Sequence, residues 1–333
     1  MASTINGDIA KIISMPHIDR ARIAVLIPCY NEEVAVAQVV HGFREALPDA
    51  RIYVFDNNST DATRANALAA GAIVRHVSRP GKGNVVRRMF ADIDADIYVL
   101  VDGDATYHAK SARSLVDTLV EENLDMVVGT RVHEHEEAYR RGHQFGNRWL
   151  TGAMTRIFGG SFTDMLSGYR VFSRRFAKSF PAMSRGFEIE TELTIHALEL
   201  RMPYAELATP YGARPEGSTS KLSTYSDGIR ILSTIIKLFA IERPLQFYGA
   251  LSGLLAAVAL LLSLPLFVTY MESGLVPRFP TAILSTGLVM LSAIGFVTGV
   301  ILETVTIGRR EAKQLRYLAI GSPSCLSGEE ESR

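Results

Sequence analysis

Two patterns of hydrophobic and polar positions divide the chain. From residue 22 to about residue 210, short apolar runs alternate with longer stretches in which apolar side chains recur at helical spacing. Short apolar runs between turn residues are typical of buried β-strands, and the longer stretches are typical of amphipathic helices. Strands that alternate with helices predict an α/β fold, with a mostly parallel sheet that has helices on both faces.

The expected elements can be placed by residue. Strands are expected at Ile23–Ile27, Arg51–Phe55, Ile73–Val77, Ile97–Val101 and Met126–Val128. Helices are expected at Val34–Leu47, from about Thr60, at Asn84–Asp92, at Ser111–Glu122 and at Glu190–Leu200. Because ligands of parallel sheets bind beyond the carboxyl ends of the strands, the residues after each strand are the first candidates for a site.

The second pattern covers residues 247–307 and is almost free of charge. Its charged side chains are Glu272, Arg278 and Glu303. Two apolar stretches, 247–271 and 281–307, are each long enough to cross a bilayer as a helix, and the short connection between them predicts a transmembrane hairpin. Two buried helices of a soluble protein are a weaker alternative, because core helices rarely run this long without a polar face.

Basic side chains flank the outer ends of this hairpin, whereas its connection holds Arg278 alone. The flanking residues are Lys237, Arg243, Arg309, Arg310, Lys313 and Arg316. The positive-inside rule therefore predicts an integral protein of the inner, cytoplasmic membrane, with both large flanks in the cytoplasm. The N-terminus lacks the order of basic, apolar and small residues that marks a signal peptide, which agrees with a cytoplasmic start.

Just before the hairpin, residues 225–243 carry apolar side chains at helical spacing. This spacing predicts an amphipathic helix, either in the membrane interface or packed on the soluble domain. The expected organisation is an N-terminal extension (1–21), a catalytic α/β domain (22–224), the juxtamembrane helix (225–243), the two spans (247–271 and 281–307) and a partly disordered cytoplasmic tail (308–333).

Composition narrows the classes of function. The 35 Lys and Arg residues equal the 35 Asp and Glu residues in number, so the chain lacks the basic excess of nucleic-acid-binding proteins. The two cysteines, Cys29 and Cys325, are too few for a disulfide framework or a zinc cluster. A hydrophobic share of 47% argues against a chain that is disordered as a whole.

Polar side chains follow three of the expected strands, at Pro28–Glu33, Asp56–Asp61 and Asp102–Asp104. Because these strands are expected to be parallel, their acidic residues should converge on one rim of the sheet. The acidic set is Glu32, Asp56, Asp102 and Asp104. Loop solvation or helix capping accounts for any one of these residues, but poorly for the whole set.

Two short patterns indicate chemistry. Asp102 and Asp104 can together hold a hard divalent cation such as Mg²⁺ or Mn²⁺, whose other ligands are waters and substrate phosphates. The turn Gly81-Lys82-Gly83 does not match a P-loop, because a glycine follows the lysine, and no dinucleotide-binding glycine pattern follows the first strand. This turn either contacts a nucleotide or anion or simply starts a helix.

Eight motifs occur along the chain in a recognisable order. They are Ile27-Pro28-x-Tyr30-Asn31-Glu32-Glu33, Asp56-x-x-Ser59-x-Asp61-x-Thr63, Gly81-Lys82-Gly83, Asp102-x-Asp104, Gly129-Thr130-Arg131, Asp164-x-x-Ser167-Gly168-Tyr169-Arg170, Phe187-Glu188-Ile189-Glu190 and Arg214-x-x-Gly217-x-x-Ser220-Lys221. With them the chain resembles family 2 glycosyltransferases of the GT-A fold. The resemblance is to the membrane-anchored polyprenyl-phosphate group that includes dolichol-phosphate mannose synthase and bactoprenol-phosphate glucosyltransferase. The motifs cover about residues 22–240, and the hairpin extends the resemblance to about residue 307.

The resemblance implies a role for each matching position. The nucleotide-sugar would be bound by Pro28, Tyr30, Glu32, Asp56, Lys82 and Asp102, and the metal ion by Asp102 and Asp104. Phosphate groups of the donor or of the acceptor lipid would be bound by Arg131, Arg214, Ser220 and Lys221. Catalysis would involve Asp104, Arg131 and Asp164, with Asp164 as a base or as an orienting residue.

Two positions stay open at this level. Many relatives continue the acidic motif with Gln, whereas this chain has Thr106, a departure at the place of a third protein ligand. Glu188 and Glu190 stand at the start of an expected helix, where they serve either the helix dipole or the site.

The resemblance and the residues together predict an inverting transferase. It would move one sugar from a UDP- or GDP-sugar to a polyprenyl phosphate on the cytoplasmic face of the membrane. A phosphate acceptor is already a nucleophile at neutral pH, so alignment and stabilisation of the leaving diphosphate would carry catalysis. The alternatives are a processive or other-acceptor family 2 enzyme of cell-envelope polysaccharide synthesis, and a non-catalytic nucleotide-sugar-binding scaffold. The sugar, the base, the exact lipid and the downstream glycan stay open, and the family is compatible with a homo-oligomer.

Overall fold

The computed structural model describes residues 21–133, 152, 162–186, 188–215 and 224–322. These residues belong to two compact units, and each is described by itself. The first unit comprises the chain up to Gly228 together with the chain from Lys313 onward. The second unit is Ile229–Ala312.

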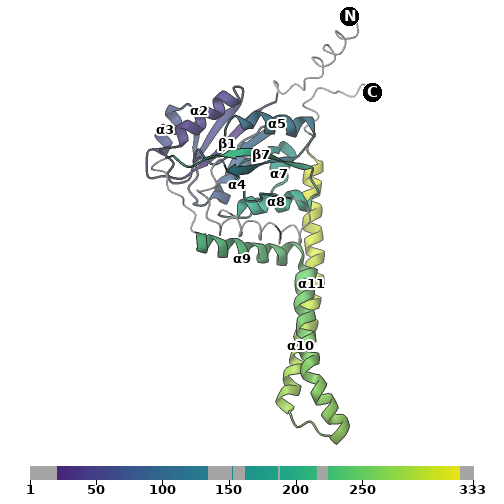
Figure 1. Cartoon of the computed structure of the whole chain (residues 1–333). Helices are drawn as coiled ribbons and strands as arrows, with labels where there is room; N and C mark the ends of the chain where they lie inside the picture. Colours follow the sequence, from purple (N-terminus) through teal and green to yellow (C-terminus); the bar gives the residue numbers. More distant parts are fainter. Residues whose placement is uncertain (1–20, 134–151, 153–161, 187, 216–223, 323–333) are drawn as a thin grey trace, which may run out of the picture. The chain divides into compact units, whose positions relative to one another are not determined.

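A seven-stranded sheet lies at the centre of the first unit (Figure 1). Its strands are β1 (Ile23–Cys29), β2 (Arg51–Asp56), β3 (Ile73–His76), β4 (Ile97–Leu100), β5 (Met126–His133), β6 (Arg170–Ser173) and β7 (Tyr204–Tyr211). They are arranged in the order β3-β2-β1-β4-β6-β5-β7. Among the described strands β6 runs antiparallel to its neighbours β4 and β5, and the other pairs are parallel. The mostly parallel sheet expected from the sequence is confirmed.

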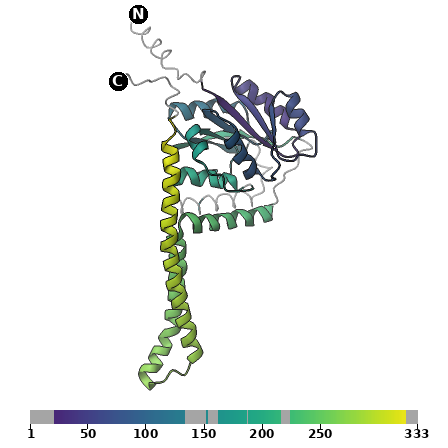
Figure 2. The ribbon, with the colours of Figure 1, turned by 180° about the vertical axis from the view of Figure 1, so that it is seen from behind.

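Helices cover both faces of this sheet, which Figure 2 shows from behind. The helices α2 (Val36–Ala46), α3 (Thr63–Ala69) and α5 (Ser111–Glu121) share one apolar core with alternate residues of the central strands. The helices α4 (Lys82–Asp92), α7 (Arg174–Ser179) and α8 (Ile189–Glu199) pack on the other face. There Phe90 of α4 contacts Tyr98 of β4 and Phe172 of β6 edge-on, with ring centroids 5.7 Å apart in each pair.

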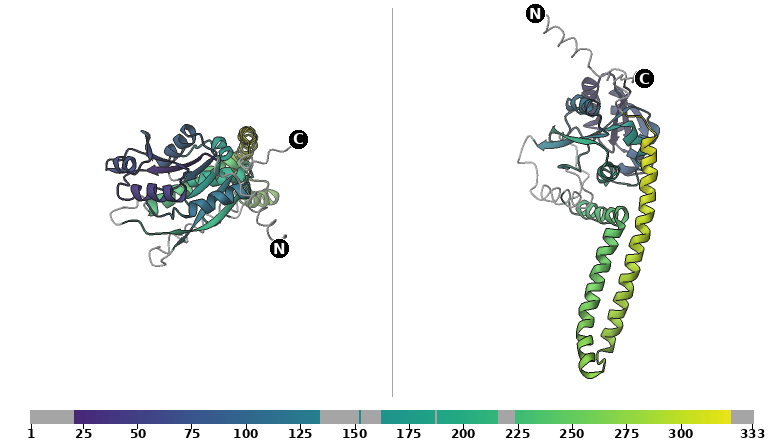
Figure 3. Two further views of the ribbon diagram at one scale, coloured as in Figure 1. Left: turned by 90° about the horizontal axis from the view of Figure 1, so that it is seen from above. Right: turned by 90° about the vertical axis from the view of Figure 1, so that its right-hand side faces the viewer.

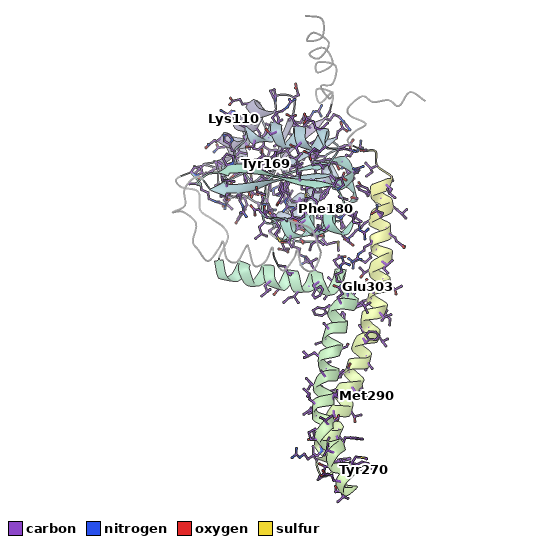
Figure 4. The ribbon with its side chains drawn as sticks, turned by 45° about the vertical axis from the view of Figure 1, so that its right-hand side comes forward. Lys110, Tyr169, Phe180, Tyr270, Met290 and Glu303 are labelled. Carbon is purple, nitrogen blue, oxygen red and sulfur yellow. The ribbon has the colours of Figure 1, made fainter. Side chains whose placement is uncertain are left out.

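Two of the seven strands, β6 and β7, lie outside the five predicted runs, and β6 is a short apolar segment that begins with an arginine. Arg170 is nevertheless fully buried, and its guanidinium donates to the carbonyl oxygens of Ser167 and Met165 and to Thr194 Oγ1. The next residue toward the N-terminus, Tyr169 (labelled in Figure 4), packs edge-on against Phe43 of α2 at 5.9 Å. Buried cations of this kind persist where backbone oxygens satisfy their donors.

The second unit contains α9 (Thr224–Glu242, of which residues from 229 belong to it), α10 (Pro244–Ser273) and most of α11 (Phe279–Leu318). The helices α10 and α11 are long and apolar enough to cross a membrane, and the most apolar 18-residue windows in them have mean hydropathies of 2.4 and 2.1. The spans expected at 247–271 and 281–307 lie within them. The helix α9 occupies the stretch expected to be amphipathic.

α10 and α11 lie side by side as an antiparallel pair (Figure 3). Ser292 Oγ donates to the carbonyl oxygen of Ser252 at 2.8 Å, and Gly295 and Gly299 of α11 allow α10 to approach closely. Small residues at such positions let apolar helices pack against each other in a membrane. Gly274 ends α10 in a left-handed conformation, with φ of 68°, that suits glycine.

Candidate active site

The loops after β1, β2 and β4 meet at the carboxyl edge of the sheet because these three strands are parallel neighbours. The loops after β1 and β2 are tied together by hydrogen bonds between backbone and side chains. Asn31 N donates to Ser59 Oγ at 2.9 Å, Thr60 N donates to Asn31 Oδ1 at 2.8 Å, and Glu32 N donates to Thr63 Oγ1 at 2.7 Å. The polar residues after both strands therefore form one rigid rim.

Asp104 is buried in this rim and is satisfied from two sides. Its Oδ1 accepts a hydrogen bond from Thr106 Oγ1 at 2.6 Å, and its Oδ2 lies 2.6 Å from Arg214 Nη2. Arg214 Nη1 also lies 3.7 Å from Glu32 Oε1. One guanidinium thus links the loop after β1 with the loop after β4. Thr106 takes the role of a hydroxyl that orients Asp104.

Asp102 pairs with the lysine of the glycine-rich turn. Lys82 Nζ lies 2.5 Å from Asp102 Oδ1 and also contacts Glu190 Oε1 at the start of α8. Burial lowers the pKa of Lys82, but the charges and hydrogen bonds of Asp102 and Glu190 outweigh it and hold the pKa above its ordinary value. Burial raises the pKa of Glu190 above its ordinary value, and the charge of Lys82 offsets only part of that rise. Lys82 is therefore a charged lysine between two acidic side chains.

Two glycines make room for close contacts around the acidic loop. A Cβ atom at Gly168 would come within 2.4 Å of Asp102 Oδ2, and a Cβ atom at Gly103 would come within 2.5 Å of Cys29 Sγ. Neither contact is possible without a shift of the neighbour. Cys29 is buried, and its sulfur lies against Gly103 in the acidic loop.

Asp164 and Arg131 form a second, separate pair on the edge formed by β5 and β7. Arg131 Nε and Nη2 each donate to an oxygen of Asp164 at 2.7 Å, and Arg131 N donates to Oδ2 at 3.2 Å. Burial raises the pKa of Asp164, but Arg131 outweighs it and holds the pKa below its ordinary value. Glu206 of β7 holds the backbone before this aspartate by accepting from Thr163 N and Asp164 N. Asp164 is thus a fixed, ionised carboxylate.

The predicted residues fall into groups. Glu32, Asp104 and Arg214 form one group, Asp102 and Lys82 a second, and Arg131 and Asp164 a third. Asp56 is buried beside Cys29 on the neighbouring strand, where it accepts from Ser59 N and lies 3.4 Å from His76 Nδ1. Pro28 is half-buried and Tyr30 is exposed at the end of β1. Ser220 and Lys221 lie outside the described residues.

Two acidic residues of α8 were not among the predicted site residues. Glu190 contacts Lys82, and Glu192 accepts from Met183 N and Ser184 N at 2.7 Å each. The motif around Glu190 was visible in the sequence, but a glutamate at a helix start is equally typical of a helix-dipole interaction. Only the long-range contact with Lys82 separates the two interpretations.

The acidic residues fit a hard divalent cation by their chemistry. Asp102 and Asp104 offer carboxylate oxygens from one short loop, and both are balanced by cations, Lys82 and Arg214. Within the part of the chain that the structure describes, no group of three or more His, Cys, Asp and Glu residues is arranged around one metal position. A pair of carboxylates suits Mg²⁺ or Mn²⁺, which take remaining ligands from water and substrate phosphates.

Comparison with known proteins finds relatives that span most of the chain. A model of glycosyl transferase family 2 matches residues 24–180. Glycosyltransferase AglJ of Haloferax volcanii is 35% identical over 250 residues, 74% of this chain and 81% of that protein. The dodecaprenyl-phosphate galacturonate synthase of Rhizobium johnstonii is 24% identical over 304 residues, 86% of this chain and 88% of that protein.

A solved structure has the same fold. Glucosyl-3-phosphoglycerate synthase from Mycobacterium tuberculosis, in complex with Mg²⁺ and uridine diphosphate, superimposes with a TM-score of 0.55 and 25% identity, covering 66% of this chain and 79% of that chain. The α/β sheet, the acidic loops at its carboxyl edge and the sequence relatives lead to one conclusion. This chain belongs to glycosyltransferase family 2 and is a transferase with a GT-A fold.

Proposed function

We propose that this transferase moves a single sugar from a UDP- or GDP-sugar to a polyprenyl phosphate at the cytoplasmic face of the membrane. The observation that carries the proposal is the acidic rim, in which Asp102 and Asp104 are each paired with a cation, on a chain that also contains two apolar helices. A polar donor site and an apolar hairpin in one chain suit a water-soluble donor and a lipid acceptor. The Rhizobium relative is named as a synthase of a polyprenyl-phosphate sugar, and the mycobacterial structure contains Mg²⁺ and uridine diphosphate.

The predicted site residues would bind different parts of the donor and the acceptor. The rim built from Tyr30, Glu32 and Asp56 would bind the nucleoside, and Lys82 would lie near the donor diphosphate. A divalent ion held by Asp102 and Asp104 would neutralise charge on the diphosphate. The cations Arg131, Arg214 and Lys221, together with the hydroxyl of Ser220, would bind phosphate groups, for which a bidentate guanidinium is well suited.

The transfer itself is a single displacement. An oxygen of the acceptor phosphate forms a bond to the anomeric carbon, the bond from that carbon to the diphosphate oxygen breaks, and the nucleoside diphosphate leaves. Attack from the opposite face inverts the anomeric configuration. Because the acceptor is an anion, no proton has to be removed from it. Asp164, whose pKa Arg131 holds low, would therefore orient Arg131 rather than act as a base.

The C-terminal helices α9, α10 and α11 would attach the transferase to the membrane. The helices α10 and α11 would span the bilayer, and α9, with exposed Leu232 and Ile236, would lie in the interface. Arg and Lys residues near the start of α9 would then meet the acceptor phosphate at the surface while its tail stays in lipid.

The test is an assay of the full chain in lipid nanodiscs with a panel of UDP- and GDP-sugars, Mg²⁺ or Mn²⁺, and a polyprenyl phosphate. A lipid that carries one sugar is the expected product. A polymer would identify a processive synthase, transfer only to soluble phosphorylated acceptors would remove the lipid from the proposal, and nucleotide-sugar binding without any transfer would identify a scaffold.

Within this assay, Asp104→Asn is expected to lower turnover by at least about a hundredfold, because the carboxylate that would hold the metal ion is lost. Asp94→Asn is the matched control, since Asp94 is an exposed carboxylate that pairs with Arg22 and Arg174 on the surface. Unchanged turnover in Asp104→Asn, with wild-type unfolding behaviour, would remove the proposed role of this residue.

A further inference from the structure

Asp102 and Glu190, which both pair with Lys82, differ in their exposure. The side chain of Asp102 is 28% exposed, whereas those of Lys82 and Glu190 are 9% and 6% exposed. Asp102 therefore faces the open side of the site, and Glu190 lies on the buried side of the lysine. The ammonium group stands between a carboxylate that can reach a ligand and one that cannot.

The backbone is built to deliver Lys82 to this place. Gly81 has a φ of 114°, and a Cβ atom there would lie 2.2 Å from the carbonyl oxygen of Arg185. A Cβ atom at Gly83 would lie 2.3 Å from the carbonyl oxygen of Ser184. The glycines of the Gly-Lys-Gly turn thus let it press against the segment just before α8. This packing, rather than a phosphate loop, explains the two glycines.

The segment before α8 is in turn held by α8 itself. Glu192 accepts from Met183 N and Ser184 N, and Arg87 of α4 donates to the carbonyl oxygens of Ala182 and Ser184. The lysine and Glu190 are therefore placed by rigid elements on both sides. Because rigid elements hold both residues in place, the contact between Lys82 and Glu190 has a defined geometry.

The contact between Glu190 and Lys82 changes the net charge beside Asp102. When Glu190 is ionised in its contact with Lys82, the side chains of Lys82, Asp102 and Glu190 together carry a net charge of minus one, and Asp102 keeps its attraction for a cation. Without Glu190, one negative charge beside the buried ammonium group would be lost, and Lys82 would compete more strongly with a cation for Asp102. Repulsion between charges this close is strong where water is largely excluded.

We propose that Glu190 is a positioning residue that neutralises Lys82 and so keeps Asp102 available to the divalent cation. This role rests on the proposed function, since it presumes that Asp102 binds the cation. Glu190 touches neither the donor nor the cation in this role. It acts through Lys82.

The experiment compares wild type with Glu190→Gln as full chains in nanodiscs. Mn²⁺ binding is measured by electron paramagnetic resonance at saturating UDP or GDP, whichever the wild type binds, and nucleotide binding is measured separately in EDTA. Glu190→Gln is expected to weaken Mn²⁺ binding on the order of tenfold, because it adds one net positive charge near the ion. Nucleotide binding in EDTA is expected to stay equal or to become tighter, because the nucleotide is an anion.

The double variant Glu190→Gln/Lys82→Met restores the local charge. It is expected to recover Mn²⁺ binding to within about threefold of wild type, which is the coupling that a double-mutant cycle measures. Glu188→Gln is the matched control, because Glu188 stands at the same helix start and accepts from the backbone of Arg185 and Gly186. This control is expected to bind Mn²⁺ like wild type.

Each outcome has a definite meaning. Equal Mn²⁺ binding by wild type and Glu190→Gln would overturn the role of Glu190 and leave the metal site intact. Weaker binding of both Mn²⁺ and nucleotide, with no recovery in the double variant, would show that Glu190 only supports the fold of α8. A wild type that binds nucleotide but no Mn²⁺ would overturn the proposed metal site, and this role with it.

Discussion

At the residue scale, the acidic loop depends on two glycines, Gly103 and Gly168, whose lack of a side chain leaves room for neighbouring groups. Gly103 has no side chain because Cys29 Sγ occupies the space beside it, and Gly168 has none because Asp102 does. The sequence shows these glycines as parts of motifs without a reason for them. Their reason is a close approach between segments that are far apart in the chain.

We predict that Gly103→Ala impairs the site by overpacking. The new methyl group would meet Cys29 Sγ at 2.5 Å, so the acidic loop must shift, and we expect a stability loss of about 1–3 kcal/mol together with weaker Mn²⁺ binding. Cys29→Ala in the same chain removes the sulfur and is expected to recover much of both losses. Thermal unfolding and Mn²⁺ titration of the two variants check this, and a double variant no better than Gly103→Ala would contradict it.

At the scale of single elements, α8 shows how tertiary packing overrides a local pattern. Its sequence places Glu190, Glu192 and His196 among apolar residues without a clear polar stripe, and all three are buried. Each glutamate is satisfied from outside the helix, by Lys82 and by the backbone of residues 183 and 184. A helix that is buried on nearly all sides can contain charged side chains only when groups outside the helix pair with them or donate hydrogen bonds to them.

His196 in α8 is expected to make the fold sensitive to acid. Burial, with a smaller contribution from Lys313, lowers the pKa of His196 to about 3, and its Nε2 meets Ser179 Oγ at 3.1 Å. Below the ordinary pKa of about 6.5 the unfolded chain binds a proton that the folded chain does not, so stability falls as the pH falls from about 6.5 toward 3. This one group would cost about 1.4 kcal/mol by pH 5.5.

The check is the thermal unfolding midpoint of wild type and His196→Gln in detergent micelles between pH 7.5 and 5.5. Groups common to both proteins cancel in the difference, so the midpoint of wild type should fall further than that of the variant. Parallel curves would show that His196 takes up its proton in the folded state.

At the scale of the whole molecule, the chain combines an α/β transferase unit with an apolar helical hairpin. The last turns of α11 belong to the transferase unit, where Lys313 Nζ lies 2.7 Å from Glu199 Oε2 and Tyr317 donates to Asp125 Oδ2 at 2.8 Å. One continuous helix thus begins in the hairpin and ends on the transferase unit. Figure 4 places Met290 and Glu303 along this helix and Tyr270 near the end of α10.

The proposed topology predicts opposite labelling of the two ends of α11. In a Cys29→Ala/Cys325→Ser background, Val276→Cys in the connection should react with an impermeant maleimide from outside intact cells or spheroplasts. Ala319→Cys should react only after permeabilisation, because the basic flanks favour the cytoplasm. The reverse pattern would invert the topology, and labelling of both sites from outside would exclude a membrane hairpin.

The sequence by itself determined the periodic elements, the hairpin and the acidic rim. These follow from local rules, because apolar spacing reports which face of a strand or helix is buried, and residues after parallel strands must meet at one edge of the sheet. Asp102 and Asp104 could be assigned to that edge on this ground alone.

Only the tertiary structure decided which charges neutralise one another and where β6 and β7 lie. Arg214 reaches Asp104 and Glu190 reaches Lys82 across more than a hundred residues of sequence. The antiparallel β6, with its buried arginine, fits between β4 and β5. No local pattern encodes such pairings, because a buried charge is stable only when packing brings a distant partner to it.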